Sequence, residues 1–278
     1  MQNSKAPPEF DVAIDPEEVS KIIESFVRQY VEERGQEGVV VGMSGGIDSC
    51  VVAALCARAL GKSRVLGLML PERSSSADDM KDAALFCDKL GIRYECVDIS
   101  DMVDAIAETL AEKPDVKALA NVKARARMIV LYYYANTMRR MVAGTSNKTE
   151  LLVGYFTKYG DGGSDLLPIG DLYKSQVRQL AGYLDIPDNI IRKAPTAGLW
   201  RGQTDEGEMG ITYGKLDKIL CGFELDLPAG RIAEFAGVPE KKVERIRAMH
   251  ENSRHKRQTA PIPKIGLKTI GTDWKENI

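Results

Sequence analysis

The stretch that decides the fold is Gly42-Met43-Ser44-Gly45-Gly46-Ile47-Asp48-Ser49. An apolar, β-branched run at 39–41 precedes it, and a run with helical periodicity at 50–55 follows it. This order is typical of a buried parallel strand that turns directly into a helix. Glycines let backbone N–H groups approach an anion, Ser44 and Ser49 add hydroxyl donors, and a helix N-terminus carries partial positive charge. The stretch therefore predicts a loop that binds phosphate.

Asp48 does not suit a simple phosphate cradle, because its carboxylate would repel the ligand. A divalent cation between the two groups removes this repulsion, and Mg²⁺ commonly takes that position. The loop therefore predicts a nucleotide bound together with Mg²⁺. A tight turn without a ligand is the structural alternative, but the acid and the helix that follows favour the phosphate interpretation.

The spacing of the loop excludes two common nucleotide motifs. No Gly-Lys-Ser/Thr follows at the P-loop spacing, and the dinucleotide pattern Gly-x-Gly-x-x-Gly is absent from the loop. Ser-Gly-Gly-x-Asp-Ser at 44–49 resembles instead the signature of the ATP pyrophosphatases. Enzymes of this class split ATP between its α- and β-phosphates and adenylate a substrate.

Composition limits the classes of protein that the chain can represent. A chain of 278 residues with 44% hydrophobic residues can bury a large core, and a net charge of −2 does not favour nonspecific nucleic-acid binding. The first ten residues are polar, and no run reaches the ~18 apolar residues of a membrane span. We therefore expect a cytoplasmic protein with no membrane or nucleic-acid partner. Its five cysteines are expected to be buried free thiols.

Strand-like runs alternate with helical ones in the first part of the chain. An Asp-Pro-Glu-Glu start at 15–18 opens a helix that extends to about 34, and strands are predicted at 39–42, 64–70, 93–99 and 141–144. This alternation predicts an α/β fold with a doubly wound parallel sheet. Ligands bind beyond the carboxyl ends of such strands. The loops that begin at Ser44, Pro71, Ser100 and Thr145 should therefore carry the site.

The second part of the chain reads as helices alone, at about 172–184, 206–222, 229–237 and 239–253. We expect one domain over 1–278, with a nucleotide-binding core at about 15–170 and additional C-terminal helices at about 171–278. Two polar segments, about 72–79 and 199–210, are predicted to be mobile without ligand and to close over the site.

Six further motifs turn the general resemblance into a specific one. In chain order they are Asn-Val-Lys-Ala-Arg-Ala-Arg-Met at 121–128, Gly-Thr-Ser-Asn-Lys-Thr-Glu at 144–150, Thr-Lys-Tyr-Gly-Asp-Gly-Gly-Ser-Asp-Leu-Leu-Pro at 157–168, Lys-Ala-Pro-Thr-Ala-Gly-Leu-Trp at 193–200, Gln-Thr-Asp-Glu at 203–206 and His-Lys-Arg at 255–257. Together with the phosphate loop they resemble the NAD⁺ synthetases. The segment at 144–150 is closer to the archaeal and glutamine-dependent branches than to many bacterial members.

The resemblance implies a ligase that amidates deamido-NAD⁺ to NAD⁺ while ATP is split to AMP and pyrophosphate. It also implies a homodimer whose dinucleotide site lies near the subunit interface. Glutamine-dependent members carry a large amidase domain ahead of the synthetase domain, whereas about forty residues precede the loop here. We therefore expect ammonia itself to be the nitrogen donor.

Residue roles follow from the resemblance, position by position. ATP contacts fall on the phosphate loop, namely Gly42, Met43, Ser44, Gly45, Gly46, Ile47, Asp48 and Ser49, and on Thr145, Lys174 and Thr196. Deamido-NAD⁺ contacts fall on Arg125, Lys158, Asp165, His255 and Lys256. Asp48 and Glu150, at the ends of the first and fourth strands, could share Mg²⁺.

The predicted catalytic residues are Asp48, Lys174 and Asp161. Adenylation needs groups that position the reactants and neutralise charge rather than a covalent nucleophile. Amidation needs neutral ammonia although ammonium dominates at neutral pH, so a general base is useful. Asp161 is the candidate for that base, and Asp165 is the reserve.

Other interpretations of these residues remain open at this point. Glu150 could simply complement a helix dipole, and Lys174 and Arg125 could be solvated charges on amphipathic helices. A different ATP pyrophosphatase, such as a tRNA-thiolating or deazapurine-forming enzyme, usually adds Cys-x-x-Cys pairs or a basic module, and this sequence has neither. A nucleotide sensor without turnover is the non-enzymatic alternative.

Overall fold

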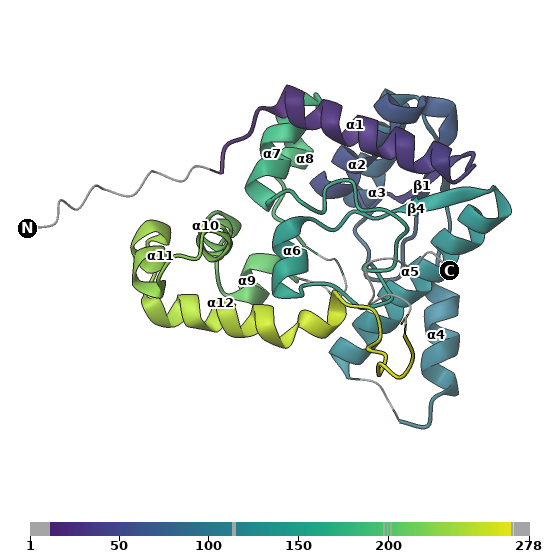
Figure 1. Cartoon of the computed structure of the whole chain (residues 1–278). Coiled ribbons are helices and arrows are strands. Elements are labelled where there is room, and N and C mark those ends of the chain that lie inside the picture. The colour runs from purple at the N-terminus through teal and green to yellow at the C-terminus, as the bar shows by residue number, and fades with distance from the viewer. Residues whose placement is uncertain are drawn as a thin grey trace, which may run out of the picture.

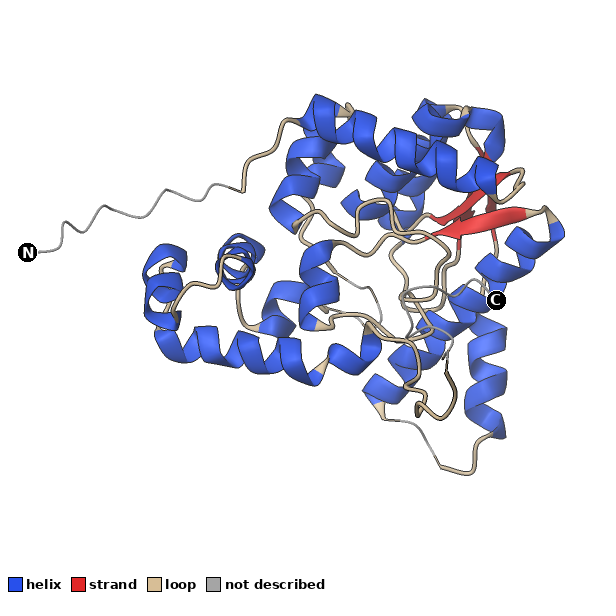
Figure 2. Ribbon diagram, viewed as in Figure 1, coloured by secondary structure: helices blue, strands red, loops and turns tan. Residues whose placement is uncertain are grey.

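The computed structural model describes residues 12–112, 115–196, 198, 200, 202–267 and 269. Its described part contains a four-stranded sheet, in the order β3-β2-β1-β4, in which all neighbouring strands are parallel. Val40 at the centre of the sheet pairs with Leu66 on one side and with Val142 on the other. The strands are β1 (Gly38–Gly42), β2 (Val65–Met69), β3 (Arg93–Cys96) and β4 (Arg140–Ala143) (Figures 1 and 2).

Helices cover both faces of this sheet, which confirms the predicted doubly wound α/β fold. Successive side chains of β1 point to opposite faces, so Val39 and Val41 belong to one apolar core and Val40 to the other. The first core is completed by α1 (Pro16–Glu33), α2 (Ile47–Leu60), α3 (Ala77–Leu90), α7 (Lys174–Tyr183) and α8 (Asp188–Ile191). The second core is completed by α4 (Ser100–Thr109) and α5 (Val116–Thr137).

Local hydrogen bonds explain where the elements begin and end. The Asp15 side chain accepts hydrogen bonds from the backbone N–H groups of Glu17 and Glu18 and so opens α1, as the sequence predicts. β3 is shorter than the predicted strand at 93–99, because Asp98 accepts a hydrogen bond from the N–H of Ser100 at 2.7 Å and turns the chain into α4. The side chain of Asp98 therefore competes with strand extension.

The C-terminal helices form a cluster with its own apolar core, apart from the sheet (Figure 1). The helix predicted at 206–222 is in fact two helices, because Gly210 adopts a left-handed conformation with φ +64° and ends the first of them. The cluster consists of α6 (Lys148–Val153), α9 (Asp205–Met209), α10 (Tyr213–Glu224), α11 (Ala229–Ala236) and α12 (Glu240–Asn252). Short 3₁₀ turns stand at Lys62–Arg64 and Arg254–Lys256.

The cysteines are free, but the prediction that all of them are buried is wrong for two. Cys96 is exposed at the end of β3, an edge strand of the described sheet, and Cys221 is half-buried. The remaining three, Cys50, Cys56 and Cys87, are buried. Within the described residues, no helix combines the length and apolar character needed to cross a membrane.

Candidate active site

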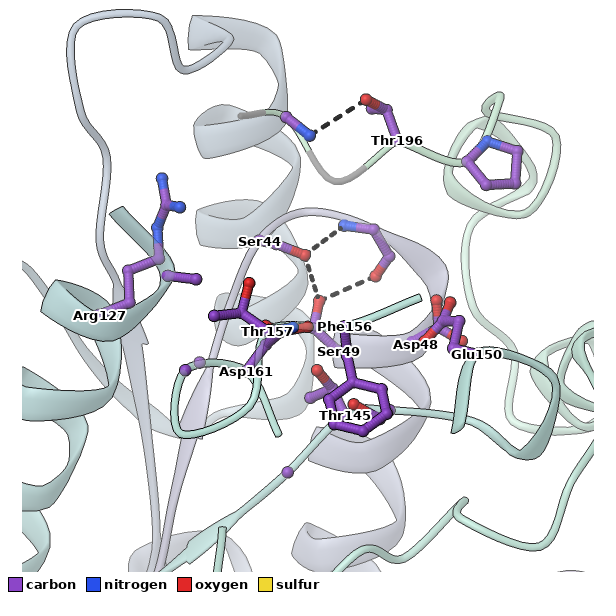
Figure 3. A pocket seen from close by; sticks show the side chains of 18 of the residues that line it. Ser44, Asp48, Ser49, Arg127, Thr145, Glu150, Phe156, Thr157, Asp161 and Thr196 are labelled. Atoms are coloured by element: carbon purple, nitrogen blue, oxygen red, sulfur yellow. Dashed lines mark hydrogen bonds between the residues drawn. The ribbon is translucent and has the colours of Figure 1, made fainter. Parts of the chain in front are cut away.

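A cavity of 570 Å³ opens at the carboxyl ends of the strands, where the alternation of strands and helices predicts the site. Its wall combines the phosphate loop, one face of α5, the segment after β4, the turn at 154–163 and the segment at 193–200. Figure 3 shows that these segments, far apart in the sequence, direct side chains toward one space. The cavity is large enough for a nucleotide-sized ligand.

The phosphate loop has a backbone that only glycine permits at one point. Gly45 adopts φ +76°, and a Cβ there would lie 2.1 Å from the carbonyl oxygen of Asp79. Ser44 Oγ accepts a hydrogen bond from the Gly46 N–H at 3.3 Å, and Ser49 Oγ donates to the Gly46 carbonyl at 2.9 Å (Figure 3). The loop therefore brings hydroxyl groups and the N-terminus of α2 to the cavity, as an oxyanion site requires.

The structure brings together Asp48, Glu150 and Lys174, which come from α2, α6 and α7. The Lys174 ammonium is ion-paired with Asp48 and lies 3.4 Å from Glu150 Oε1. Lys174 is 2% exposed, which excludes the interpretation as a solvated surface charge. Asn147 Nδ2 donates to Asp48 Oδ1 at 3.1 Å, while the Asn147 side chain caps α6 together with Glu150.

Negative charge exceeds positive charge around this ammonium. A third carboxylate, Asp205, reaches the group through Tyr213, whose hydroxyl donates to Asp205 Oδ2 at 3.0 Å and also lies 3.4 Å from Glu150 Oε1. Burial raises the pKa of Glu150 to about 8. Burial alone would lower the pKa of Lys174, but the charges of Asp48 and Glu150 outweigh it and raise that pKa. Lys174 therefore stays charged, and the acids around it favour a further cation.

The two predicted metal ligands fit Mg²⁺ on chemical grounds. Carboxylate oxygens of Asp48 and Glu150 converge on one ammonium, so both lie within reach of one cation, and Mg²⁺ prefers oxygen ligands. In the part of the chain that the structure describes, no three acidic, histidine or cysteine side chains gather as a metal site. These two acids would hold Mg²⁺ jointly with phosphate oxygens and water, the arrangement usual for this ion.

Three further predicted residues, Thr145, Asp161 and Thr196, also line the cavity (Figure 3). The Asp161 carboxylate accepts a hydrogen bond from the Thr157 N–H at 2.8 Å and is open to the cavity. The protein atoms that crowd this side chain restrict its hydration and raise its pKa.

The residues predicted for the dinucleotide divide into two groups. Lys256 lines the cavity, where its ammonium donates to the carbonyl oxygens of Gly154 and Phe156 at 2.8 Å each. The described residues that line the cavity do not include Arg125, Lys158, His255 or Asp165.

Arg125, Lys158 and His255 form a chain of contacts at the surface instead. Arg125 is exposed, and its Nη2 donates to the Lys158 carbonyl at 3.3 Å. The Lys158 ammonium donates to the carbonyl oxygen of the exposed His255 at 2.6 Å. Arg125 and His255 are therefore connected to the 154–163 turn through Lys158, which lies within it.

Asp165 has a structural position beside β4, at the edge of the described sheet. Its carboxylate accepts hydrogen bonds from the Val142 N–H at 2.7 Å and from the Tyr132 hydroxyl at 3.1 Å. The side chain therefore ties the chain after the 154–163 turn to β4. Of the two candidates for the general base, Asp161 is the one that faces the cavity.

Sequence reasoning missed Arg127, although it lies two residues from Arg125 on α5. Arg127 lines the cavity, and its Nε donates to the Leu70 carbonyl at 3.0 Å (Figure 3). The cavity face of the helix repeats every three or four residues, at 117, 120, 121, 124, 127, 128 and 131. Residues 125, 129 and 133 lie on the exposed face of the helix. Helical periodicity is the signal that would have separated the two arginines.

The sequence matches the family model described as NAD synthase over residues 19–260. The chain belongs to the NAD synthase family. Among curated relatives it is similar to the NH(3)-dependent NAD(+) synthetase of Archaeoglobus fulgidus, with 48% identity over 90% of this chain and 97% of the relative. The enzyme of the same description from Methanosarcina acetivorans is 46% identical over 91% of this chain and 100% of the relative.

Solved structures of the NAD synthase family and its neighbours have the same fold. The NMN synthetase of Francisella tularensis superposes with a TM-score of 0.82 at 39% identity, covering 91% of this chain and 100% of the other. The NH3-dependent NAD synthetase of Campylobacter jejuni gives a TM-score of 0.77 at 31% identity, with the same coverage.

Proposed function

We propose that this protein joins ammonia to deamido-NAD⁺ and releases NAD⁺, AMP and pyrophosphate at the expense of ATP. One observation carries the proposal: a single cavity holds both the phosphate loop and the buried group of Asp48, Glu150 and Lys174, opposite an acid, Asp161, that is open to the same space. The names of relatives that this chain matches over 97–100% of their length support the same reaction.

In the first half-reaction the nicotinate carboxylate attacks the α-phosphorus of ATP, and pyrophosphate leaves. The loop hydroxyls and the N-terminus of α2 hold the leaving pyrophosphate, and the Lys174 ammonium offsets the negative charge that develops on it. Asp48 and Glu150 would hold Mg²⁺, which neutralises phosphate charge when bound. Thr145 and Thr196 contribute hydroxyl groups from the cavity wall.

In the second half-reaction Asp161 takes a proton from ammonium, and the lone pair of the resulting ammonia attacks the acyl carbon of the adenylate. The attacking nitrogen then loses one proton to water, and the carbon–oxygen bond to the phosphate breaks, so that AMP leaves with the bonding electrons and the amide remains. The raised pKa of Asp161 makes its carboxylate a stronger base than an ordinary aspartate.

The dinucleotide contacts proposed for Arg125, Lys158, His255 and Lys256 extend from the cavity to the surface. Because the first three lie on the outside of the 154–163 turn, a second copy of the chain could cover them, and we propose a homodimer with the dinucleotide near its interface. Asp165 would contribute to the dinucleotide site indirectly, by fixing β4 through its hydrogen bond with the Val142 N–H. We place the protein in the cytoplasm, since its thiols are free.

Nicotinate mononucleotide is a second candidate substrate. The Francisella relative is described as an NMN synthetase, and here the cavity itself contains Lys256 but, among its described lining residues, neither Arg125 nor His255. A mononucleotide would use the cavity contacts alone, whereas a dinucleotide also uses the surface group.

An assay with ATP, Mg²⁺, ammonium and each of the two substrates separates these possibilities. Chromatography of the products should show NAD⁺ and stoichiometric AMP, with kcat/KM for deamido-NAD⁺ at least about tenfold above that for the mononucleotide. A preference for the mononucleotide would support the second candidate. Absence of AMP with either substrate would contradict both and favour a nucleotide sensor.

A further inference from the structure

Two polar residues one turn apart on α10, Tyr213 and Asp217, are fully buried beneath the phosphate end of the cavity. Both have 0% exposure, although α10 otherwise packs apolar side chains such as Leu216 and Ile219 into the C-terminal core. Burying a carboxylate and a hydroxyl is costly unless both are hydrogen-bonded. Their partners lead directly to Lys174 and the acids around it.

Asp217 holds the first turn of α7, the helix that begins at Lys174. Its Oδ2 accepts a hydrogen bond from the Ser175 N–H at 2.8 Å, and its Oδ1 accepts one from Thr149 Oγ1 at 2.6 Å. The same hydroxyl oxygen of Thr149 accepts the Lys174 N–H at 3.0 Å. The first N–H groups of a helix have no partners within the helix. Here the N–H groups of Lys174 and Ser175 are satisfied through the Asp217 carboxylate, which fixes the backbone from which the Lys174 side chain extends.

Tyr213 restricts the position of the ammonium at the far end of the Lys174 side chain. The Lys174 ammonium lies 5.1 Å from the centroid of the Tyr213 ring, within the range of a cation–π contact. The Tyr213 hydroxyl also contacts Glu150 and Asp205, as described above. A lysine has four rotatable bonds, so both its backbone and its ammonium must be held if the charge is to stay at one point.

We propose that Tyr213 and Asp217 are positioning residues, through which the C-terminal helices hold the Lys174 ammonium at the place where pyrophosphate charge develops. The inference rests on the proposed function. Asp217 acts through Thr149 and the start of α7, and Tyr213 acts through its ring and hydroxyl. Neither residue is assigned a contact with substrate.

The first test uses the Thr149 hydroxyl in the full-length enzyme, with Thr149→Val and Thr149→Ser as a matched pair. Valine keeps the shape but removes the hydroxyl, so kcat for pyrophosphate release should fall at least about tenfold, while KM for deamido-NAD⁺ stays within about threefold. Serine keeps the hydroxyl and should restore kcat to within about threefold of wild type. Equal kcat values for the two variants would overturn the proposal.

The second test is a double-mutant cycle with Asp217→Asn, Tyr213→Phe and Lys174→Met. Asp217→Asn should lower kcat about tenfold or more alone but less than about twofold in the Lys174→Met background, because the group that it positions is already gone. Tyr213→Phe keeps the ring and should lose less than Asp217→Asn. Ile219→Val, a buried apolar change on the same helix, should leave kcat unchanged.

Equal losses from Asp217→Asn in both backgrounds would overturn the proposal and indicate a purely structural role. If Asp217→Asn does not fold, the Thr149 pair decides the question alone. Failure of the proposed function gives a different result, since wild type would then form no NAD⁺ from deamido-NAD⁺ and ammonium. All kcat values are compared at a temperature at which circular dichroism shows every variant to be folded.

Discussion

The proposed phosphate site and the proposed dinucleotide site hold their positive charges in different ways. At the phosphate end, Lys174 is buried and paired with carboxylates from two other helices. At the proposed dinucleotide site, outside the described lining of the cavity, Arg125 and Lys158 donate to the backbone carbonyl oxygens of Lys158 and His255. A charged side chain held in a buried network keeps its position before the ligand arrives. A charged side chain that donates to a carbonyl oxygen at the surface is free to exchange partners. We therefore expect the proposed phosphate site to be preorganised and the proposed dinucleotide site to be completed on binding.

The largest effect is expected from Asp48→Asn at the preorganised end. Without this carboxylate the proposed Mg²⁺ site loses one of its two protein ligands, and phosphate charge stays uncompensated in a site of reduced dielectric. The kcat should therefore fall about 10³-fold, equivalent to ~4 kcal/mol. The measurement is pyrophosphate release at saturating ATP and Mg²⁺. Asp101→Asn, which removes a fully exposed carboxylate on α4, is the matched control. A rate near that of wild type would remove Asp48 from the metal assignment.

Asp161→Asn addresses the middle of the cavity and separates the two half-reactions. Loss of a general base should lower NAD⁺ formation about 100-fold, while a first turnover of pyrophosphate release persists. Wild-type activity at fixed total ammonium should rise with pH, because both ammonium and Asp161, whose pKa is raised, lose their protons. Ammonium should be used and glutamine should not. Equal losses in both half-reactions would assign Asp161 to binding rather than to proton transfer.

Arg125→Ala tests the end that is completed on binding. A guanidinium forms two parallel hydrogen bonds to a phosphate or carboxylate, so its loss should raise KM for deamido-NAD⁺ about tenfold and leave KM for ATP within a few-fold. Arg125→Lys should restore only part of the affinity. Arg231→Ala, on the distant helix α11, serves as the control for removing an exposed arginine. An unchanged KM would return Arg125 to the solvated face of α5.

The smallest effect concerns stability at the phosphate end. The folded-state pKa of Glu150 is raised to about 8, above its ordinary value of 4.5, so folding takes up a proton between these values. The stability of the ligand-free protein should therefore fall as pH rises from about 5 to 8. Calorimetry should show a smaller fall in Tm over this range for Glu150→Gln, by a few degrees. An identical pH dependence of Tm in the wild type and in Glu150→Gln would contradict the raised pKa of Glu150.

The sequence predicted the sheet, the phosphate loop and the acids at strand ends, because periodicity and glycine conformation are local properties of the chain. Helical spacing puts Arg125 and Arg127 on different faces of α5, but which face is turned toward the cavity depends on packing against the segment after β2, where Arg127 donates to the Leu70 carbonyl. Tyr213 and Asp217 were not predicted at all. Two of their partners, Thr149 and Glu150, lie more than sixty residues away, and no local pattern carries that information.

The contacts of the last 3₁₀ turn bear on how the protein is made. Lys256 and Arg257 donate to carbonyl oxygens between Leu151 and Phe156, and the His255 carbonyl accepts the Lys158 ammonium. The ribosome adds residue 158 about a hundred residues before it adds residues 255–257. During that interval the carbonyl groups at the end of α6 lack the donors that they have in the folded protein. The cavity wall therefore reaches its final form only after residue 257 has emerged, and a nascent chain arrested before residue 255 should not bind substrate.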